Sequence, residues 1–204
     1  MEKFPEHEPS VEGSSDEKAF QAYVEDLDLS PEDFNKKILD VGSGSSQFAK
    51  WAKDHQVSSE IYSIEPYQQP QEISKSLQGR AETMPFQDNA FDLVVSNASI
   101  PNVFLGEAPE VMKEKVRDSL VGFMRVVRPG GEIRLGRVLK GNVYESQQNI
   151  SAAVEEVLEE LRQAYGAEVE EIRYSAGDTY EYDAKQEPIR ILARAYLIKI
   201  RKPN

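Results

Sequence analysis

Short apolar runs alternate with amphipathic helical patterns along most of this 204-residue chain. The runs that we expect to be strands lie at residues 37–41, 60–64, 77–81, 91–96 and 132–138. The patterns that we expect to be helices between them lie at residues 46–55, 70–77 and 110–127. A strand, a helix and a second strand fold as a right-handed βαβ unit, which makes the strands parallel and covers both faces of the sheet. The alternation therefore predicts an α/β fold with a mainly parallel sheet.

The carboxyl-terminal part of the chain breaks this alternation. Apolar residues at helical spacing over residues 149–165 predict another helix, which ends at Gly166. Two strand patterns follow at residues 168–174 and 189–200, with only a polar loop between them. Because consecutive strands joined without a helix pair antiparallel, we expect a carboxyl-terminal β-hairpin.

The length of the chain fits one α/β domain with a sizeable core. Residues 1–15 are rich in Glu, Pro, Ser and Gly, which predicts a disordered acidic tail. We expect a single domain over residues 16–204. Within it, amino-terminal helices at 16–35 precede a core at 36–138, and a helix and hairpin at 139–204 complete the fold.

The net charge of −12 restricts the partners of the protein. Proteins that bind nucleic acid place Lys and Arg against the phosphates, but acidic residues outnumber basic ones here by 36 to 24. Nucleic acid and an anionic membrane surface are therefore disfavoured partners. Four arginines crowd one region, and we expect them at helix ends and on strand surfaces: Arg125, Arg128, Arg134 and Arg137.

Several further classes are excluded by what the sequence lacks. No apolar run approaches the ~20 residues that a membrane-spanning helix needs. The first residues have neither the apolar core nor the basic region of a secretory signal, so we expect a cytoplasmic protein. The chain has no cysteine, which excludes disulfides, thiol catalysis and cysteine-bound zinc, and we predict no metal site. The oligomeric state is not set by any pattern in the sequence.

Three segments that suit ligand binding lie where ligands of open α/β sheets bind, at the carboxyl ends of the expected strands. The first strand runs into a tight turn at Gly42 and Gly44, where glycine permits positive φ and the next helix offers free N–H groups. Glu65 closes the second strand, and its carboxylate can accept two hydrogen bonds from a ribose diol. Residues 79–92 join the third and fourth strands, beside the place of an adenine bound at the same edge.

Four motifs of this chain occur in the order and spacing of a known family. They are Asp40-Val41-Gly42-Ser43-Gly44, Glu65, the Ala81 to Asp92 run and Arg128-Pro129-Gly130-Gly131. In these features the chain resembles the class I S-adenosylmethionine-dependent methyltransferases over roughly residues 36–138, the expected cofactor-binding core. It is most similar to the branch of ubiquinone/menaquinone-type and other small-molecule enzymes. The resemblance implies a Rossmann-like, doubly wound, seven-stranded sheet whose last two strands form an antiparallel hairpin.

The resemblance also implies S-adenosylmethionine as the cofactor and roles at its methionine end. Asp40, Gly42 and Gly44 are expected to line that end of the cofactor. Asn97, just past the fourth strand, is expected to lie near the methionine amino group and the substrate entrance.

For the ribose and adenine, the resemblance implies a second set of residues. Glu65 is expected to hold the ribose hydroxyls, and Pro66 or Tyr67 to flank the adenine. The backbone N–H of Ala81 and the side chain of Glu82 are expected at the adenine edge.

Two positions depart from the family pattern. Ser46 stands where the family commonly has a third glycine, a mild change because small residues fit there. Arg80 stands where the family commonly has an aspartate that accepts a hydrogen bond from the adenine amino group. A guanidinium cannot accept that bond, and Glu82 is the candidate substitute.

The sequence offers no clear catalytic base, so the catalytic residues stay unknown. His7 lies in the expected tail and His55 follows the helix at 46–55, so we interpret both as solvent-exposed. Residues 97–102 lack the histidines common in this branch and the Asp/Asn-Pro-Pro-aromatic motif of amino-methylating nucleic-acid enzymes. Other side chains on the substrate side are better explained by packing: Tyr23, Tyr144 and Glu145.

Three hypotheses follow. The leading one is a methyltransferase that acts on a small-molecule acceptor by in-line displacement, with the amino-terminal helices as a lid. The alternative is a catalytically silent domain of the same fold that acts as a binding or scaffold protein. A nicotinamide dehydrogenase is disfavoured, because the pattern Gly-x-Gly-x-x-Gly needs glycine where this chain has Gln47.

Overall fold

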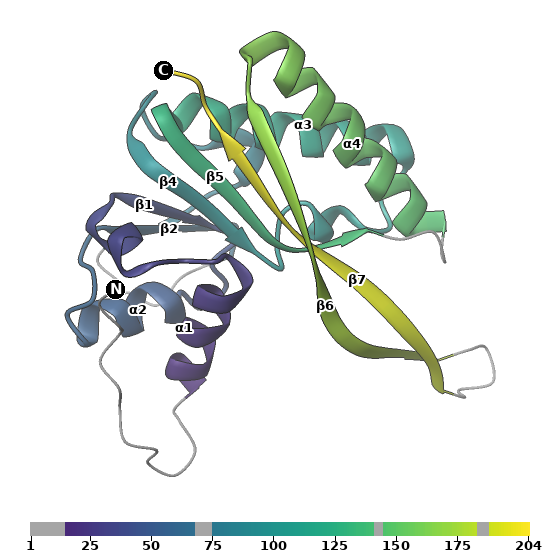
Figure 1. Cartoon of the computed structure of the whole chain (residues 1–204), viewed down its shortest axis with the longest axis horizontal. Helices are drawn as coiled ribbons and strands as arrows, with labels where there is room; N and C mark the ends of the chain where they lie inside the picture. The colour runs from purple at the N-terminus through teal and green to yellow at the C-terminus, as the bar shows by residue number, and fades with distance from the viewer. Residues whose placement is uncertain (1–14, 68–74, 141–144, 183–187) are drawn as a thin grey trace.

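The computed structural model describes residues 15–67, 75–140, 145–182 and 188–204, and its strands form one seven-stranded sheet (Figure 1). The strands are β1 Ile38–Val41, β2 Ile61–Glu65, β3 Ser76–Gln78, β4 Phe91–Asn97, β5 Val127–Lys140, β6 Glu168–Tyr182 and β7 Pro188–Arg201. Their order in the sheet is β3-β2-β1-β4-β5-β7-β6. Neighbours from β3 to β5 are parallel, whereas β7 is antiparallel to both β5 and β6. The predicted doubly wound α/β sheet with an antiparallel carboxyl-terminal hairpin is confirmed.

Helices cover both faces of this sheet (Figure 1). α1 (Ser15–Asp26) and α2 (Gln47–Asp54) pack on one face, and α3 (Pro109–Val126) and α4 (Glu145–Tyr165) pack on the other. Three 3-10 helices lie in the connections: η1 Pro31–Asn35, η2 Ala81–Thr83 and η3 Asn102–Phe104.

The strands divide their side chains between two apolar cores, because successive residues of a strand point to opposite faces. On β1, Ile38 packs with α1 and α2, whereas Leu39 and Val41 pack with α3 and α4. The same alternation directs Asp40 toward the face of α1 and α2, beside its register partner Ser63 on β2. Polar side chains are thus placed on a buried face, close to the carboxyl ends of the strands.

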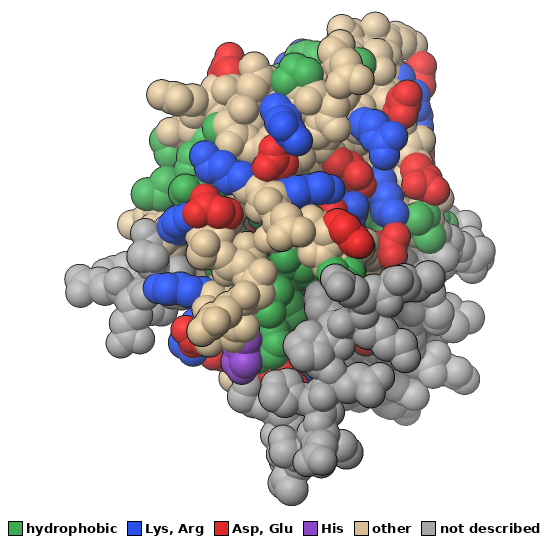
Figure 2. Space-filling view, turned by 60° about the vertical axis from the view of Figure 1, so that its left-hand side comes forward, with side chains coloured by type: hydrophobic (Ala, Val, Ile, Leu, Met, Phe, Trp, Pro, Cys, Tyr) green, Lys and Arg blue, Asp and Glu red, His purple; other side chains and the backbone are tan. Residues whose placement is uncertain are grey.

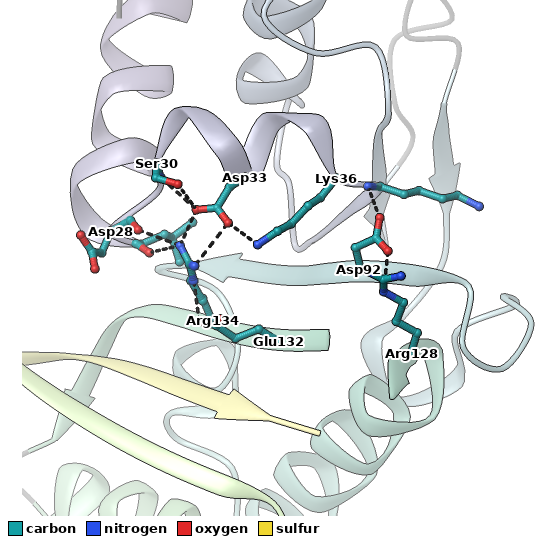
Figure 3. A network of polar contacts seen from close by, with 10 residues as sticks. Asp28, Ser30, Asp33, Lys36, Asp92, Arg128, Glu132 and Arg134 are labelled. Atoms are coloured by element: carbon teal, nitrogen blue, oxygen red, sulfur yellow. Dashed lines mark hydrogen bonds and ion pairs between the residues drawn. The ribbon is translucent and has the colours of Figure 1, made fainter. Parts of the chain in front are cut away.

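A buried ion-pair network fixes η1 to the sheet (Figure 3). Arg134 of β5 is only 7% exposed, and its Nη1 lies 3.0 Å from Oδ2 of Asp33. Arg134 also donates hydrogen bonds to the carbonyl oxygens of Leu27 and Asp28, at 3.2 and 2.7 Å, and pairs with Glu132. Since these groups belong to the turn after α1, to η1 and to β5, the network holds the amino-terminal helices against the sheet.

The four crowded arginines each pair with a carboxylate. The pairs are Arg125–Asp88 at 2.9 Å, Arg128–Asp92 at 2.7 Å, Arg134–Asp33 at 3.0 Å and Arg137–Asp26 at 2.6 Å. The predicted surface position is wrong for Arg134, because the alternation of β5 directs it inward. Basic side chains are interspersed with acidic ones on the face that Figure 2 shows.

Most predicted boundaries agree with the structure to within a few residues, and β5 is the main correction before the hairpin. It begins at Val127 rather than at residue 132, so the Arg128–Gly131 turn lies inside the strand. There Gly130 N donates to Lys202 O and Lys202 N donates to Gly131 O, both at 3.0 Å. The chain end therefore pairs with a segment that the sequence suggested to be only a break.

The hairpin is also longer than predicted, because β6 continues to Tyr182 and β7 begins at Pro188. Residues 178–182, expected in a polar loop, pair with β7 beyond a register shift between Ser175 and Asp178. The hairpin projects well past the rest of the sheet (Figure 1). Most of the expected helix at 70–77 and all of the expected tail except Ser15, which starts α1, lie outside the described residues.

Candidate functional site

A cavity of about 320 Å³ opens at the carboxyl ends of β1 and β2. Its walls are residues 41–42, 64–67 and 79–82, parts of the loop 99–107, and Lys115 of α3. In the sheet, β1 lies between β2 and β4. The chain continues from β1 to β2 on one side, and it later returns to the other side of β1 as β4. This edge is therefore the switch point of the sheet, where ligands of open α/β folds bind.

The two glycines of the turn after β1 have different surroundings. Gly42 has a φ of +73°, and a Cβ built on it falls 1.8 Å from Oγ of Ser99. Gly44 has a φ of +55°, and no described atom lies within 4 Å of the corresponding Cβ position. Glycine is thus required at 42 because Ser99 approaches the backbone, while Gly44 leaves space beside the turn.

Glu65 is held at the end of β2 by the same turn. The Gly44 N–H donates to Oε2 of Glu65 at 3.0 Å, and the residue is 8% exposed. Among the described residues this is the hydrogen bond that the Glu65 carboxylate receives. Glu65 also lines the cavity, so a buried carboxylate is oriented there with hydrogen-bonding capacity left for a ligand.

Asp40 lies behind the turn and does not line the cavity. It is fully buried, and its Oδ1 accepts a hydrogen bond from the Tyr23 hydroxyl at 3.2 Å. Its other oxygen, Oδ2, has no hydrogen-bond partner in the described part of the chain. Burial raises the pKa of Asp40 to about 8, with the Tyr23 hydrogen bond opposing the rise and the charge of Glu65 adding to it.

Asn97 lies at the carboxyl end of β4 and also stays outside the cavity wall. Its Nδ2 donates to Oδ2 of Asp26 at 3.0 Å, and Arg137 pairs with the same oxygen at 2.6 Å. Oδ1 of Asn97 is buried without a described partner. The end of β4 is therefore hydrogen-bonded to the last residue of α1. The sequence predicts that the methionine end of the cofactor binds near this position.

The opposite end of the cavity combines exposed apolar residues with charges. Tyr67 and Val103 are 78% and 58% exposed and line the cavity. Arg80 and Glu82 line it too, and neither side chain makes a hydrogen bond or ion pair within the described residues. Lys115 lies nearby and pairs with a wall residue of the loop after β4, Glu107, at 2.5 Å.

Five of the predicted cofactor residues line this cavity and three lie behind or beside it. Those in the wall are Gly42, Glu65, Pro66, Ala81 and Glu82. Those outside the wall are Asp40, Gly44 and Asn97. The sequence interpretation missed Ser99, Val103, Glu107 and Lys115 as wall residues. Their position after β4 was a usable signal, because loops at the carboxyl ends of parallel strands surround the ligand site.

The remaining candidates for acid–base chemistry lie away from the cavity. His55 is exposed at the end of α2, with Nδ1 2.9 Å from the Trp51 carbonyl and its ring stacked on that indole at 4.0 Å. His7 and Tyr144 lie outside the described residues, and the side chain of Glu145 is not described. Within the described ranges no group of His, Cys, Asp and Glu is arranged to hold a metal ion.

The residues present fit S-adenosylmethionine on three observations. A buried carboxylate, Glu65, lines the cavity and has the acceptor oxygens that ribose hydroxyls require. Tyr67 and Val103 offer exposed apolar surface for an adenine ring. Behind the glycine turn, Asp40 has a buried oxygen without a partner, which suits a cationic methionine group nearby. Strand order and site together define the class I methyltransferase fold.

Comparisons with known proteins agree with this class. Residues 39–135 match the family model described as a methyltransferase domain. Together with the strand order of the sheet, this match supports the class I methyltransferase fold. Among curated proteins, none matches the sequence significantly.

Solved structures of low sequence identity share the fold. One is a methyltransferase of Methanosarcina mazei, with 15% identity, a TM-score of 0.53, and coverage of 86% of this chain and 98% of that one. Another is the YcgJ protein of Bacillus subtilis, with 14% identity, a TM-score of 0.52, and coverage of 88% and 99%. A possible histamine N-methyltransferase of Thermotoga maritima has 17% identity, a TM-score of 0.50, and coverage of 93% and 91%. At these identities the likeness concerns the fold alone.

Within the described ranges, no helix is both long enough and apolar enough to span a bilayer.

Proposed function

We propose that the protein transfers the methyl group of S-adenosylmethionine to a small-molecule acceptor, in the manner of the ubiquinone/menaquinone-type branch. The observation that carries the cofactor is the buried Glu65 carboxylate, oriented by the Gly44 N–H at the switch point of the sheet. A strand-end carboxylate in that position suits the two hydroxyls of a ribose. The small-molecule acceptor is supported by the net charge of −12, which opposes binding of a nucleic-acid backbone.

The cofactor is assigned to residues that the chain places at two ends of the site. Pro66, Tyr67 and Val103 flank the adenine in this proposal, and the Ala81 backbone and Glu82 contact its edge. The methionine end is assigned to the glycine turn, with Asp40 and Asn97 behind and beside it. Lys115 and Glu107 also line the cavity.

The chemistry proposed for the protein itself is positioning. When bound, S-adenosylmethionine supplies an activated methyl group on a sulfonium. The chain then has to align the acceptor with that methyl group and exclude water, which accounts for large rate effects without covalent participation. We assign no catalytic base, because His55 lies at the exposed end of α2 and Asp40 lies buried behind the turn.

Replacing Glu65 tests the cofactor site. Glu65→Ala should weaken S-adenosylmethionine binding by about 1.5–3 kcal/mol, because charge-assisted hydrogen bonds to the ribose are lost. Isothermal calorimetry of wild type and variant measures the difference. The matched control is Glu60→Ala, since Glu60 lies just before the other end of β2, is exposed, and pairs with Lys75. Equal affinity of Glu65→Ala and wild type would show that the ribose binds elsewhere.

The acceptor is tested separately. Mass spectrometry of ligands that co-purify with the protein, followed by transfer of labelled methyl from S-adenosylmethionine to the identified compound, should reveal a small-molecule product. Label found only in RNA or protein fractions would contradict the proposed acceptor class. Cofactor binding without any transfer would favour the alternative, a catalytically silent binding protein.

A further inference from the structure

The sheet face beneath α1 carries polar atoms that have no partner. Asp40 and Ser63 are register neighbours on β1 and β2, and Oδ2 of the first and Oγ of the second are both buried without a described hydrogen bond. Oδ1 of Asn97 on β4 is also buried without a described hydrogen bond. Nine in ten or more buried polar groups in proteins are paired. Three unpaired atoms near one edge of a sheet therefore require a specific explanation.

Tyr23 is the side chain that α1 contributes to this polar group. Its hydroxyl donates to Oδ1 of Asp40 at 3.2 Å. Its ring stacks on Phe48 of α2 at 4.4 Å with an interplanar angle of 14°. Burial, followed by the charges of Asp40 and Glu65, raises the pKa of Tyr23 well above its ordinary value of 10.0, so the phenol keeps its proton. Tyr23 is thus a fixed hydrogen-bond donor to one oxygen of Asp40.

The electrostatic surroundings of Asp40 are one-sided. The groups that face it are Tyr23 from α1 and the carboxylate of Glu65 from β2, and no described cation is among those that shift its pKa. A carboxyl group buried beside a second carboxylate is stable in its protonated form. A positive charge that arrives beside the glycine turn changes that balance in favour of the anion.

We propose that Tyr23 is a positioning residue of the cofactor site: it orients Asp40 so that the cationic methionine end of the cofactor converts Asp40 to its anion, with release of one proton to solvent. This inference rests on the proposed cofactor. The positive ligand replaces the lost proton as the counter-charge of Asp40, and the Tyr23 hydroxyl stabilises the anion by a hydrogen bond. Docking of α1 and occupation of the cofactor site are thereby coupled through the contact of Tyr23 with Asp40.

The test measures protons released on binding. S-adenosylmethionine is titrated into the 204-residue chain at pH 6.5, where the ligand ammonium is almost entirely protonated, in two buffers of different ionisation enthalpy. Wild type should release close to one proton per bound ligand, and Asp40→Asn should release none. Tyr23→Phe should bind about tenfold more weakly at this pH, since the anion loses a hydrogen bond. Its proton release should persist to higher pH than that of wild type.

Tyr62→Phe is the matched control. Tyr62 precedes Ser63 on β2, packs against the opposite core and lies edge-on to Phe91 at 5.5 Å. Removal of its hydroxyl should leave affinity and proton release unchanged.

The outcomes separate this inference from the proposed function. Wild type that binds no S-adenosylmethionine contradicts the proposed function itself. Wild type that binds without proton release, or Tyr23→Phe that behaves as wild type, overturns the positioning role and leaves the cofactor site intact. In that case a buried water satisfies Asp40 and Tyr23 only packs α1. If Tyr23→Phe does not fold, wild type that releases no proton, or Asp40→Asn that still releases one, overturns the proposal by itself.

Discussion

Two buried aspartates of this protein have opposite surroundings. Asp33 in η1 is bound by Lys36 Nζ at 2.6 Å, by Ser30 N at 2.9 Å and by Arg134 Nη1 at 3.0 Å (Figure 3). Among the described residues, Asp40 near the end of β1 has one donor, the Tyr23 hydroxyl, at 3.2 Å. Burial alone raises the pKa of both, but the donors and cations around Asp33 lower its pKa overall, whereas that of Asp40 rises to about 8.

The difference separates a carboxylate whose partners are supplied by the chain from one that has an oxygen without a described partner. A buried charge costs stability unless its partners are supplied by the chain. The chain supplies them at Asp33, where the amino-terminal helices join the sheet. At Asp40, near the edge where the cofactor is proposed to bind, Oδ2 has no partner among the described residues. Strongly shifted pKa values of this kind accumulate at functional sites for the same reason.

The largest expected effect is on stability, and it comes from removing Asp33 from the ion-pair network around Arg134. Asp33→Ala should lower the free energy of unfolding by about 3–5 kcal/mol, because Arg134 remains buried with part of its charge uncompensated. Urea unfolding measured by circular dichroism gives the value. Asp54→Ala is the control, since Asp54 is 53% exposed, pairs with Lys50 on the surface of α2, and should change stability by at most about 1 kcal/mol. A loss for Asp33→Ala no larger than for this control would refute the assigned role of the network.

The pH dependence of stability should distinguish the two aspartates by sign. Asp33, with a lowered pKa, contributes stability above its ordinary value of 3.8 and loses it as the pH falls through its folded value. The contribution of Asp40 to stability changes with pH in the opposite direction. Between 3.8 and about 8 the unfolded chain has ionised Asp40 while the folded protein keeps the proton, so stability declines as the pH rises.

Asp40→Asn isolates this contribution. The unfolding free energy of wild type minus that of the variant should fall by up to about 1.4 kcal/mol per pH unit between pH 5 and 8. Urea unfolding at four pH values across that interval measures it without any cofactor. Parallel curves for the two proteins would mean that Asp40 is already ionised, and the contrast with Asp33 would disappear.

The sequence was informative for local elements and for the glycine turn that holds Glu65, and less so for contacts between residues far apart in the chain. The strand–turn–helix pattern around Gly42 and Gly44 predicted the switch point, because backbone geometry there depends on adjacent residues. Nothing near Arg134 in sequence indicates that it crosses to Asp33, 101 positions away. In the same way Ser99 reaches Gly42 only through the pairing of β1 with β4. Such contacts depend on strand order and side-chain direction, which periodicity does not specify.

The smallest expected effect concerns Arg80, which lines the cavity at the end proposed for the adenine and stands where the family pattern has an aspartate. Arg80→Asp should strengthen S-adenosylmethionine binding by about 0.5–1.5 kcal/mol, because an acceptor for the adenine amino group is restored at an exposed position. Calorimetry with Arg80→Ala alongside separates the gain of an acceptor from the loss of a cation, since only the first variant supplies an acceptor.

The gain in S-adenosylmethionine affinity expected for Arg80→Asp depends on Glu82. Its carboxylate lines the same cavity and has no described partner, so it is the side chain available to accept from the adenine in the natural protein. If it does so, Glu82→Ala should weaken binding by about 1 kcal/mol with Arg80 in place and by less once Arg80→Asp has been introduced. Losses of equal size in both backgrounds would show that the two positions act independently. The adenine end would then depend on the Ala81 backbone and the apolar faces of Tyr67 and Val103.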